Sequence, residues 1–201
     1  MVVFIEPHYD DFILSAGIYS TKNPVDEVIT VFKSKKNTGG SRALSKDLGK
    51  TYIELGFPNI DWKNPSVLFE PKDLLNALDP LLLKSNLILT VLGVGNPAHF
   101  FLREFIIKNY VKKTSVFFFR DFPHSYDSTK LGNLPFSQYI RDFKKVSSIG
   151  STVEFTSKVE LFKKYYPSQK SLLWFEREQF DNPVPEEVYE YTGLSKHEAI
   201  W

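Results

Sequence analysis

Apolar residues along the chain follow a pattern that predicts alternating strands and helices. Short apolar runs rich in β-branched and aromatic residues have the composition of buried strands, and they occupy residues 2–5, 25–32, 86–92 and 115–119. Segments with helical spacing of apolar positions lie between and after these runs, at residues 12–19, 41–55, 72–83 and 99–111. This alternation predicts an α/β fold: a three-layer Rossmann-like sandwich with a mostly parallel sheet.

The pattern changes after Arg120. Residues 121–139 are rich in turn formers and aromatic residues and show no period, which predicts a long functional loop. Helical spacing returns at 156–166 and 171–179. Residues 183–191 are expected to form a short helix, since prolines lie near the start of this segment. No repeat, low-complexity tract or glycine/serine linker interrupts the chain, so residues 1–201 are expected to form one α/β domain.

Composition and charge exclude several classes of function. The chain has 25 lysines and arginines against 24 acidic residues, so nothing in its net charge favours a nucleic-acid partner or an anionic membrane. It has no cysteine, so a transition-metal site must use histidine and carboxylate ligands. The sequence contains no Gly-X-Ser-X-Gly elbow, so it does not support a serine hydrolase.

The localisation is expected from what the sequence lacks. Without a signal peptide or a long unbroken apolar stretch, we expect a cytoplasmic protein with no membrane insertion. The oligomeric state stays open.

Residues able to carry chemistry follow the first predicted strand. Ligand sites in open α/β sheets lie at the carboxyl ends of strands, and there the chain reads Glu-Pro-His-Tyr-Asp-Asp, which includes His8, Asp10 and Asp11. Two adjacent carboxylates are costly unless a cation compensates their charge. Metal binding is one interpretation, and capping of the following helix by Asp10 and Asp11 is the other. A nucleotide-binding turn would require glycines at this point, and two carboxylates would repel a pyrophosphate.

A second candidate residue, His99, begins the helix that follows the strand at residues 86–92. At the same edge of the sheet it could meet His8 and Asp11. Two histidines and one aspartate form a known catalytic zinc set that leaves a position open for water, and the same set also accepts iron, cobalt or manganese. A single histidine at a helix start is more often solvated or packed, so the hypothesis depends on its pairing with the first motif.

Four segments resemble the PIG-L/LmbE-like zinc N-deacetylases, a family that removes acetyl groups from N-acetylglucosamine-containing sugars and related amides. Residues 7–17, PHYDDFILSAG, resemble the family's His-Pro-Asp-Asp-Glu signature, and residues 96–104, NPAHFFLRE, match in part its His-Pro-Asp-His motif with a following Arg-Glu. Residues 120–123, RDFP, are similar to a Glu-Asp-Phe-Pro element, and residues 158–169 are similar to a helix end with a Lys…Tyr-X-Ser-Gln pattern. The matches keep the family's order and span most of the chain.

The resemblance implies that His8, Asp11 and His99 bind zinc and that Asp10 is the general base. It also implies hydrolysis of the N-acetyl group of an N-acetylglucosamine-type amino sugar, or of a related small amide, by a metal-activated water. The partner would then be this small-molecule substrate. Tyr9 stands in place of the signature's proline.

Of two further departures from the family pattern, the one at Asn96 affects the implied chemistry. Phe12 replaces the signature's final glutamate, and Asn96 replaces a histidine that stabilises the oxyanion and protonates the leaving amine. Asn96 can bind substrate through a hydrogen bond but supplies no titrating proton. The general acid must then come from elsewhere: the protonated Asp10 is one candidate and His124 of the loop is another, although a histidine on a polar loop is more often only solvated. The alternative is a catalytically altered relative that binds a sugar-like ligand without turnover, or one that cuts another amide or ester.

Overall fold

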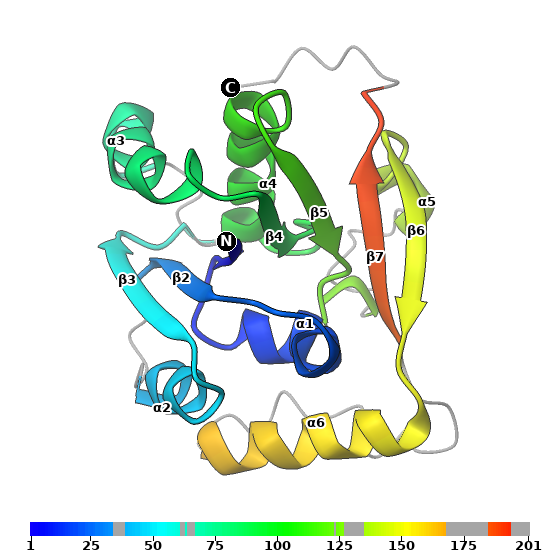
Figure 1. Cartoon of the computed structure of the whole chain (residues 1–201). Coiled ribbons are helices and arrows are strands. Elements are labelled where there is room, and N and C mark those ends of the chain that lie inside the picture. Colours follow the sequence, from blue (N-terminus) through cyan, green and yellow to red (C-terminus); the bar gives the residue numbers. More distant parts are fainter. Residues whose placement is uncertain are drawn as a thin grey trace.

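A computed structural model of the chain describes residues 1–33, 39–60, 63, 67–122, 124–126, 135–167 and 185–193. In these residues a seven-stranded sheet has the strand order β3-β2-β1-β4-β5-β7-β6 (Figure 1). The strands are β1 (Val2–Glu6), β2 (Glu27–Phe32), β3 (Thr51–Phe57), β4 (Leu87–Val91), β5 (Ser115–Phe119), β6 (Phe143–Ile149) and β7 (Glu186–Tyr191). Strands β1 to β5 are parallel, and β7 is antiparallel to both β5 and β6. The predicted α/β fold with a mostly parallel sheet is confirmed.

Helices cover both faces of the sheet (Figure 1). They are α1 (Asp11–Lys22), α2 (Gly39–Asp47), α3 (Pro71–Leu82), α4 (Pro97–Tyr110), α5 (Phe136–Tyr139) and α6 (Thr152–Tyr165), with a 3₁₀ turn η1 (His124–Tyr126). Successive side chains of a strand point to opposite faces: Val3 of β1 joins a core with α3 and α4, and Phe4 joins a core with α1, α2 and α6. Among the described residues, no helix combines the length and the apolar character needed to cross a membrane.

The predicted helix at residues 41–55 is wrong in its second half. Helix α2 ends at Asp47, and the chain enters β3 at Thr51. Between them Gly49 has a φ of 67°, the left-handed conformation that commonly ends helices. β3 is an edge strand whose residues are mostly half-buried. It therefore lacks the continuous apolar run that marks the buried strands.

The predicted short helix at residues 183–191 is also wrong over its described part, because Glu186–Tyr191 form β7 between β5 and β6. Strand β6 is largely exposed, so its sequence shows no apolar run either. The predicted helix at 171–179 lies outside the described residues. The loop predicted at 121–139 is described in part, and that part includes η1 and α5.

Helix α1 is interrupted at Ala16, whose φ of −132° and ψ of 18° are not helical. In a regular helix the amide of Ile18 would donate to the carbonyl oxygen of Leu14 across this position. Here Lys158 Nζ donates to the Leu14 oxygen at 3.0 Å, and Glu186 accepts from the Ile18 N–H at 2.8 Å. Lys158 and Glu186 also contact each other at 3.0 Å. A buried ion pair from α6 and β7 therefore binds both backbone groups that flank the break.

Candidate metal centre

The candidate site lies where β1 and β4 end. These two strands are parallel neighbours, so their carboxyl ends meet at one edge of the sheet. The chain leaves β1 through His8 and begins α1 at Asp11, and it leaves β4 to begin α4, whose first turn contains His99. Gly93 allows α4 to approach closely, because it has a φ of 77° and a Cβ there would lie 2.7 Å from the His99 carbonyl oxygen. The fold thus brings the three predicted metal ligands together.

Three ligand atoms form a small triangle at this point. His8 Nδ1 lies 3.1 Å from His99 Nε2, which lies 3.3 Å from Asp11 Oδ2, and His8 Nδ1 is 3.6 Å from the same oxygen. Within the described residues, the histidine, cysteine and acidic side chains that come close enough to hold one metal ion in a group of three or more are those of His8, Asp11 and His99. Zinc bonds of about 2.0–2.1 Å in a tetrahedron separate the ligand atoms by about 3.3 Å. The triangle therefore has the size of one face of a tetrahedral zinc site.

The other nitrogen of each histidine has an oxygen partner. His99 Nδ1 lies 2.7 Å from Asp121 Oδ1, and His8 Nε2 lies 2.8 Å from Asn59 Oδ1. Since carboxylate and amide oxygens accept hydrogen bonds, these nitrogens carry the protons and leave His8 Nδ1 and His99 Nε2 with lone pairs toward the triangle. Such partners fix the tautomer and the ring orientation of metal-binding histidines. The donor set fits a divalent transition-metal ion.

The buried charges of the triangle favour a cation. Burial by itself lowers the pKa of His99, but the carboxylates of Asp11 and Asp121 outweigh burial and raise this pKa above its ordinary value. Burial likewise opposes ionisation of Asp11, yet His99 and His8 hold its pKa below the ordinary value. The carboxylates of Asp11 and Asp121 therefore favour a positive group in the triangle, and a metal ion would compete there with a proton on His99.

Asp10 is buried next to the triangle, with 9% of its surface exposed. Burial and then the charge of Asp11 raise the pKa of Asp10 to about 6. A carboxylate with a pKa near neutrality can both accept and return a proton at physiological pH. The alternative that Asp10 only caps α1 is not supported, because its side chain makes no capping hydrogen bond to the helix.

His124 and Asn96, the two remaining residues predicted from the sequence, lie at the edge of the same site. The ring of His124, in η1, contacts that of His99 edge-on at a centroid distance of 5.3 Å. Burial and then repulsion by His99 lower the pKa of His124 to about 4. Asn96 is the N-cap of α4, and its Oδ1 accepts a hydrogen bond from the Ala98 N–H at 2.9 Å. The Asn96 amide group is thereby oriented, and its Nδ2 is the atom left to donate to a ligand.

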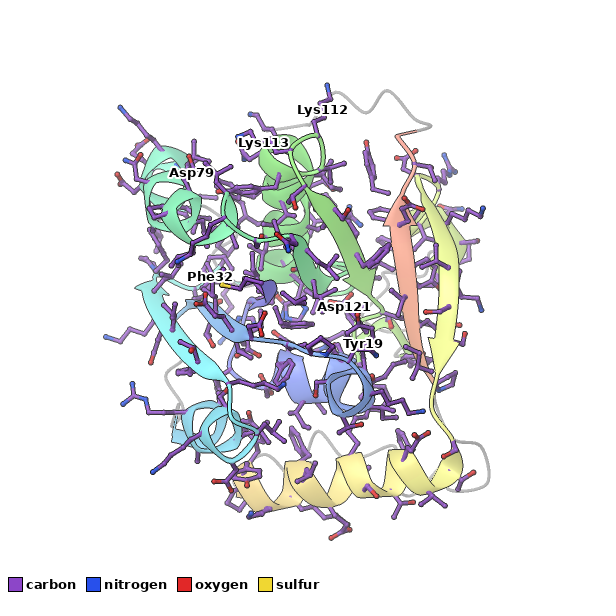
Figure 2. The ribbon with its side chains drawn as sticks, viewed as in Figure 1. Tyr19, Phe32, Asp79, Lys112, Lys113 and Asp121 are labelled. Carbon is purple, nitrogen blue, oxygen red and sulfur yellow. The ribbon has the colours of Figure 1, made fainter. Side chains whose placement is uncertain are left out.

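Three residues that support this site have no role predicted from the sequence. Asp121 and Asn59 are the histidine partners described above. Glu6 is fully buried and accepts from the Phe12 N–H at 2.7 Å and from Thr30 Oγ1 at 2.6 Å, which ties the start of α1 to β1 and β2. Asp121, labelled in Figure 2, lies just beyond the end of β5, the neighbour of β4, and is separated from β5 by Arg120. The rule that sites lie at strand ends could therefore have found it.

Comparisons with known proteins find similarity at the level of structure. No protein-family model and no curated protein matches this chain. Solved structures of similar fold include the A40926 pseudoaglycone deacetylase Dbv21, with 17% identity, 94% of this chain and 96% of that chain covered, and a TM-score of 0.63. A deacetylase–bog complex from the teicoplanin biosynthesis pathway has 16% identity, the same coverage and a TM-score of 0.62. The zinc-inhibited form of the teicoplanin deacetylase Orf2 has 15% identity, again the same coverage, and a TM-score of 0.61. At these identities the likeness shows a shared fold over nearly the whole chain.

Proposed function

We propose that this chain is a metal-dependent hydrolase that removes an acetyl group from the nitrogen of an amino sugar or a related small amide. The observation that carries the proposal is the triangle of His8 Nδ1, His99 Nε2 and Asp11 Oδ2, with distances of 3.1 to 3.6 Å. The resemblance of the sequence motifs to zinc N-deacetylases supports it. The fold shared with solved deacetylases supports it as well.

In this proposal His8, Asp11 and His99 hold the metal ion, and zinc fits their chemistry and spacing. When bound, a divalent ion at such a site acidifies a water molecule and polarises the carbonyl group of the amide. The chain itself then needs a group that moves protons and a group that binds the substrate oxygen.

Asp10 is the proton carrier. Its carboxylate takes a proton from the attacking water as the new carbon–oxygen bond forms. It then gives this proton to the nitrogen as the carbon–nitrogen bond breaks, which yields acetate and a free amine. Burial and the charge of Asp11 raise the pKa of Asp10 to about 6 in the metal-free chain, which favours the return of a proton from this carboxyl. Asp10 thus takes over proton donation from the histidine that the family has at the position of Asn96.

Asn96 and His124 serve substrate binding. Asn96 Nδ2 can donate a hydrogen bond to the developing oxyanion, since Oδ1 is occupied by the Ala98 N–H. His124, with a pKa lowered to about 4, is neutral at physiological pH. A neutral imidazole donates or accepts a hydrogen bond but holds no proton ready for the leaving amine. We therefore assign the general-acid step to Asp10.

Release of acetate from N-acetylated amino sugars tests the proposal. The metal-free chain is reconstituted with one equivalent of Zn²⁺, Co²⁺, Mn²⁺ or Fe²⁺; excess zinc is avoided because a structural neighbour is known in a zinc-inhibited form. The Asp10→Asn variant should lose about 10²- to 10⁴-fold in kcat. Glu160→Gln, at an exposed position on α6, serves as the control and should keep full activity. Equal turnover by Asp10→Asn and the unmodified chain would contradict the mechanism.

The alternative is binding of a sugar-like ligand without turnover. Asn96 favours it, because an amide brings no titrating proton to the site. Calorimetric titration with the free amino sugars and their N-acetyl forms separates the two functions. A binding protein would hold an N-acetyl sugar tightly and release no acetate, and Asp10→Asn would leave its affinity almost unchanged.

A further inference from the structure

We propose that Asn59 is a positioning residue that fixes the tautomer and orientation of His8, so that His8 Nδ1 faces the metal site. This role rests on the proposed function, in which His8 holds the metal ion, and Asn59 lies outside the sequence motifs. The contact that carries it is the 2.8 Å separation of His8 Nε2 and Asn59 Oδ1.

The two histidines of the site differ in how their second nitrogen is held. The partner of His99 is the buried carboxylate of Asp121, which lies in the loop after β5. The partner of His8 is a neutral amide, and the His8 side chain is 17% exposed. A partly exposed imidazole can adopt either neutral tautomer, and its preference is set by the hydrogen bond at the other nitrogen. Asn59 is therefore the residue that selects the metal-binding form of His8.

The backbone places Asn59 firmly although its side chain lies at the surface. On its N-terminal side, the Phe57 carbonyl oxygen accepts a hydrogen bond from the Lys33 N–H at 2.7 Å, which continues the pairing of β2 with β3. On its C-terminal side, Ile60 is buried in the core shared by α3 and α4, with 3% of its surface exposed. Pro58 fixes φ between these anchors. The amide of Asn59 is thus presented to His8 at little cost in conformational entropy.

The orientation of the amide decides the tautomer. With Oδ1 toward His8, Nε2 carries the proton and Nδ1 keeps its lone pair toward His99 and Asp11, at 3.1 and 3.6 Å. The opposite tautomer would put a proton between His8 and the metal ion and would have to be reversed before the ion binds. Loss of an outer partner of this kind lowers metal affinity by about 10- to 100-fold.

Two variants of Asn59 and one matched control test the role. Asn59→Ala removes the acceptor, whereas Asn59→Asp keeps an acceptor of the same shape and adds charge. Asn86→Ala is the control, since Asn86 is exposed and precedes β4, at the end of the strand opposite the site. Zinc affinity is measured by competition with a chromophoric chelator. We expect Asn59→Ala to bind zinc about 10- to 100-fold more weakly, and Asn59→Asp and Asn86→Ala to bind it at least as tightly as the unmodified chain.

The tautomer of His8 is measured in the metal-free protein by ¹⁵N–¹H correlation of the imidazole nitrogens at alkaline pH. The unmodified chain should show the Nε2–H form, and Asn59→Ala should show a mixture of both forms. A predominant Nδ1–H form in the unmodified chain would overturn the proposal. So would an Asn59→Ala variant that matches Asn86→Ala in both tautomer and zinc affinity, or an Asn59→Asp variant as weak as Asn59→Ala. If the unmodified chain bound no zinc, the proposed function would fail, whereas the metal-free spectra would still decide the role of Asn59.

Discussion

Removing the charge of Lys158 is expected to destabilise the protein strongly. Lys158 Nζ lies 3.0 Å from Glu186 Oε1, and the two side chains are only 5% and 1% exposed. Glu186 also accepts hydrogen bonds from the amides of Ile18 and Tyr19, at 2.8 and 2.7 Å. In Lys158→Met the carboxylate stays buried without its counter-ion. Loss of one partner of a buried ion pair costs about 3–5 kcal/mol of unfolding free energy.

The cost of Lys158→Met should shrink in acid. Burial raises the pKa of Glu186 above its ordinary value, although Lys158 lowers it. Without Lys158 this pKa rises further. A carboxyl whose pKa is higher in the folded than in the unfolded state binds protons more tightly when folded, so stability increases as the pH falls through the interval between the two pKa values. The variant should therefore lose less stability relative to the unmodified chain at pH 5 than at pH 8.

Urea unfolding followed by tryptophan fluorescence measures these losses. For an m-value of about 2 kcal/mol/M, the loss at pH 8 lowers the midpoint by about 1.5–2.5 M. The control is Lys164→Met, also on α6, where the Lys164–Asp47 pair is 63% and 53% exposed; it should lose less than about 1 kcal/mol. Lys158→Met combined with Glu186→Gln should recover part of the loss, because no unpaired charge remains. A Lys158→Met loss as small as that of Lys164→Met, or an equal loss at both pH values, would show that the buried Lys158–Glu186 pair does not stabilise the fold in this way.

Three further predictions concern the site and its support. Asp121→Ala should weaken zinc binding about 10- to 100-fold, because the acceptor that orients His99 is lost; unchanged affinity in a chelator competition would exclude this role. Gly93→Ala should cost about 2 kcal/mol or more in urea unfolding, since a Cβ would lie 2.7 Å from the His99 oxygen at a φ of 77°, whereas Gly49→Ala, with nothing within 4 Å, should cost about 1 kcal/mol. Equal losses would contradict the close approach of α4. Asp10→Asn should stabilise the metal-free protein more at pH 8 than at pH 4.5, because the buried Asp10 has a pKa of about 6 and is charged only at the higher pH. A pH-independent difference would contradict that ionisation.

The fold could be predicted where strands are buried on both faces. Continuous apolar runs mark β1, β2, β4 and β5, since helices cover both sides of these strands. The same signal fails for β3 and β6, the two edge strands, which are half-buried or exposed. It also fails for β7, which the prolines and acidic residues near its start make resemble a helix. Edge position and strand insertion depend on tertiary pairing, which a local sequence pattern does not encode.

The candidate site could be predicted to the extent that it follows buried strands. His8 and Asp11 come directly after β1, and His99 follows β4, so the strand-end rule places all three at one edge. Asn59 follows β3, a strand that the apolar pattern misses, and an exposed asparagine has no chemical signature of its own. Its contact with His8 becomes visible only when the two chain segments, 51 residues apart, are brought together.

Zinc stoichiometry shows whether His8, Asp11 and His99 form a metal centre. The purified chain, His99→Ala and His124→Ala are dialysed against the same zinc concentration and measured by elemental analysis. We expect about one zinc per chain in the unmodified protein and in His124→Ala, and almost none in His99→Ala. No zinc in the unmodified chain, or equal zinc in His99→Ala, would contradict the metal centre and with it the proposed hydrolase.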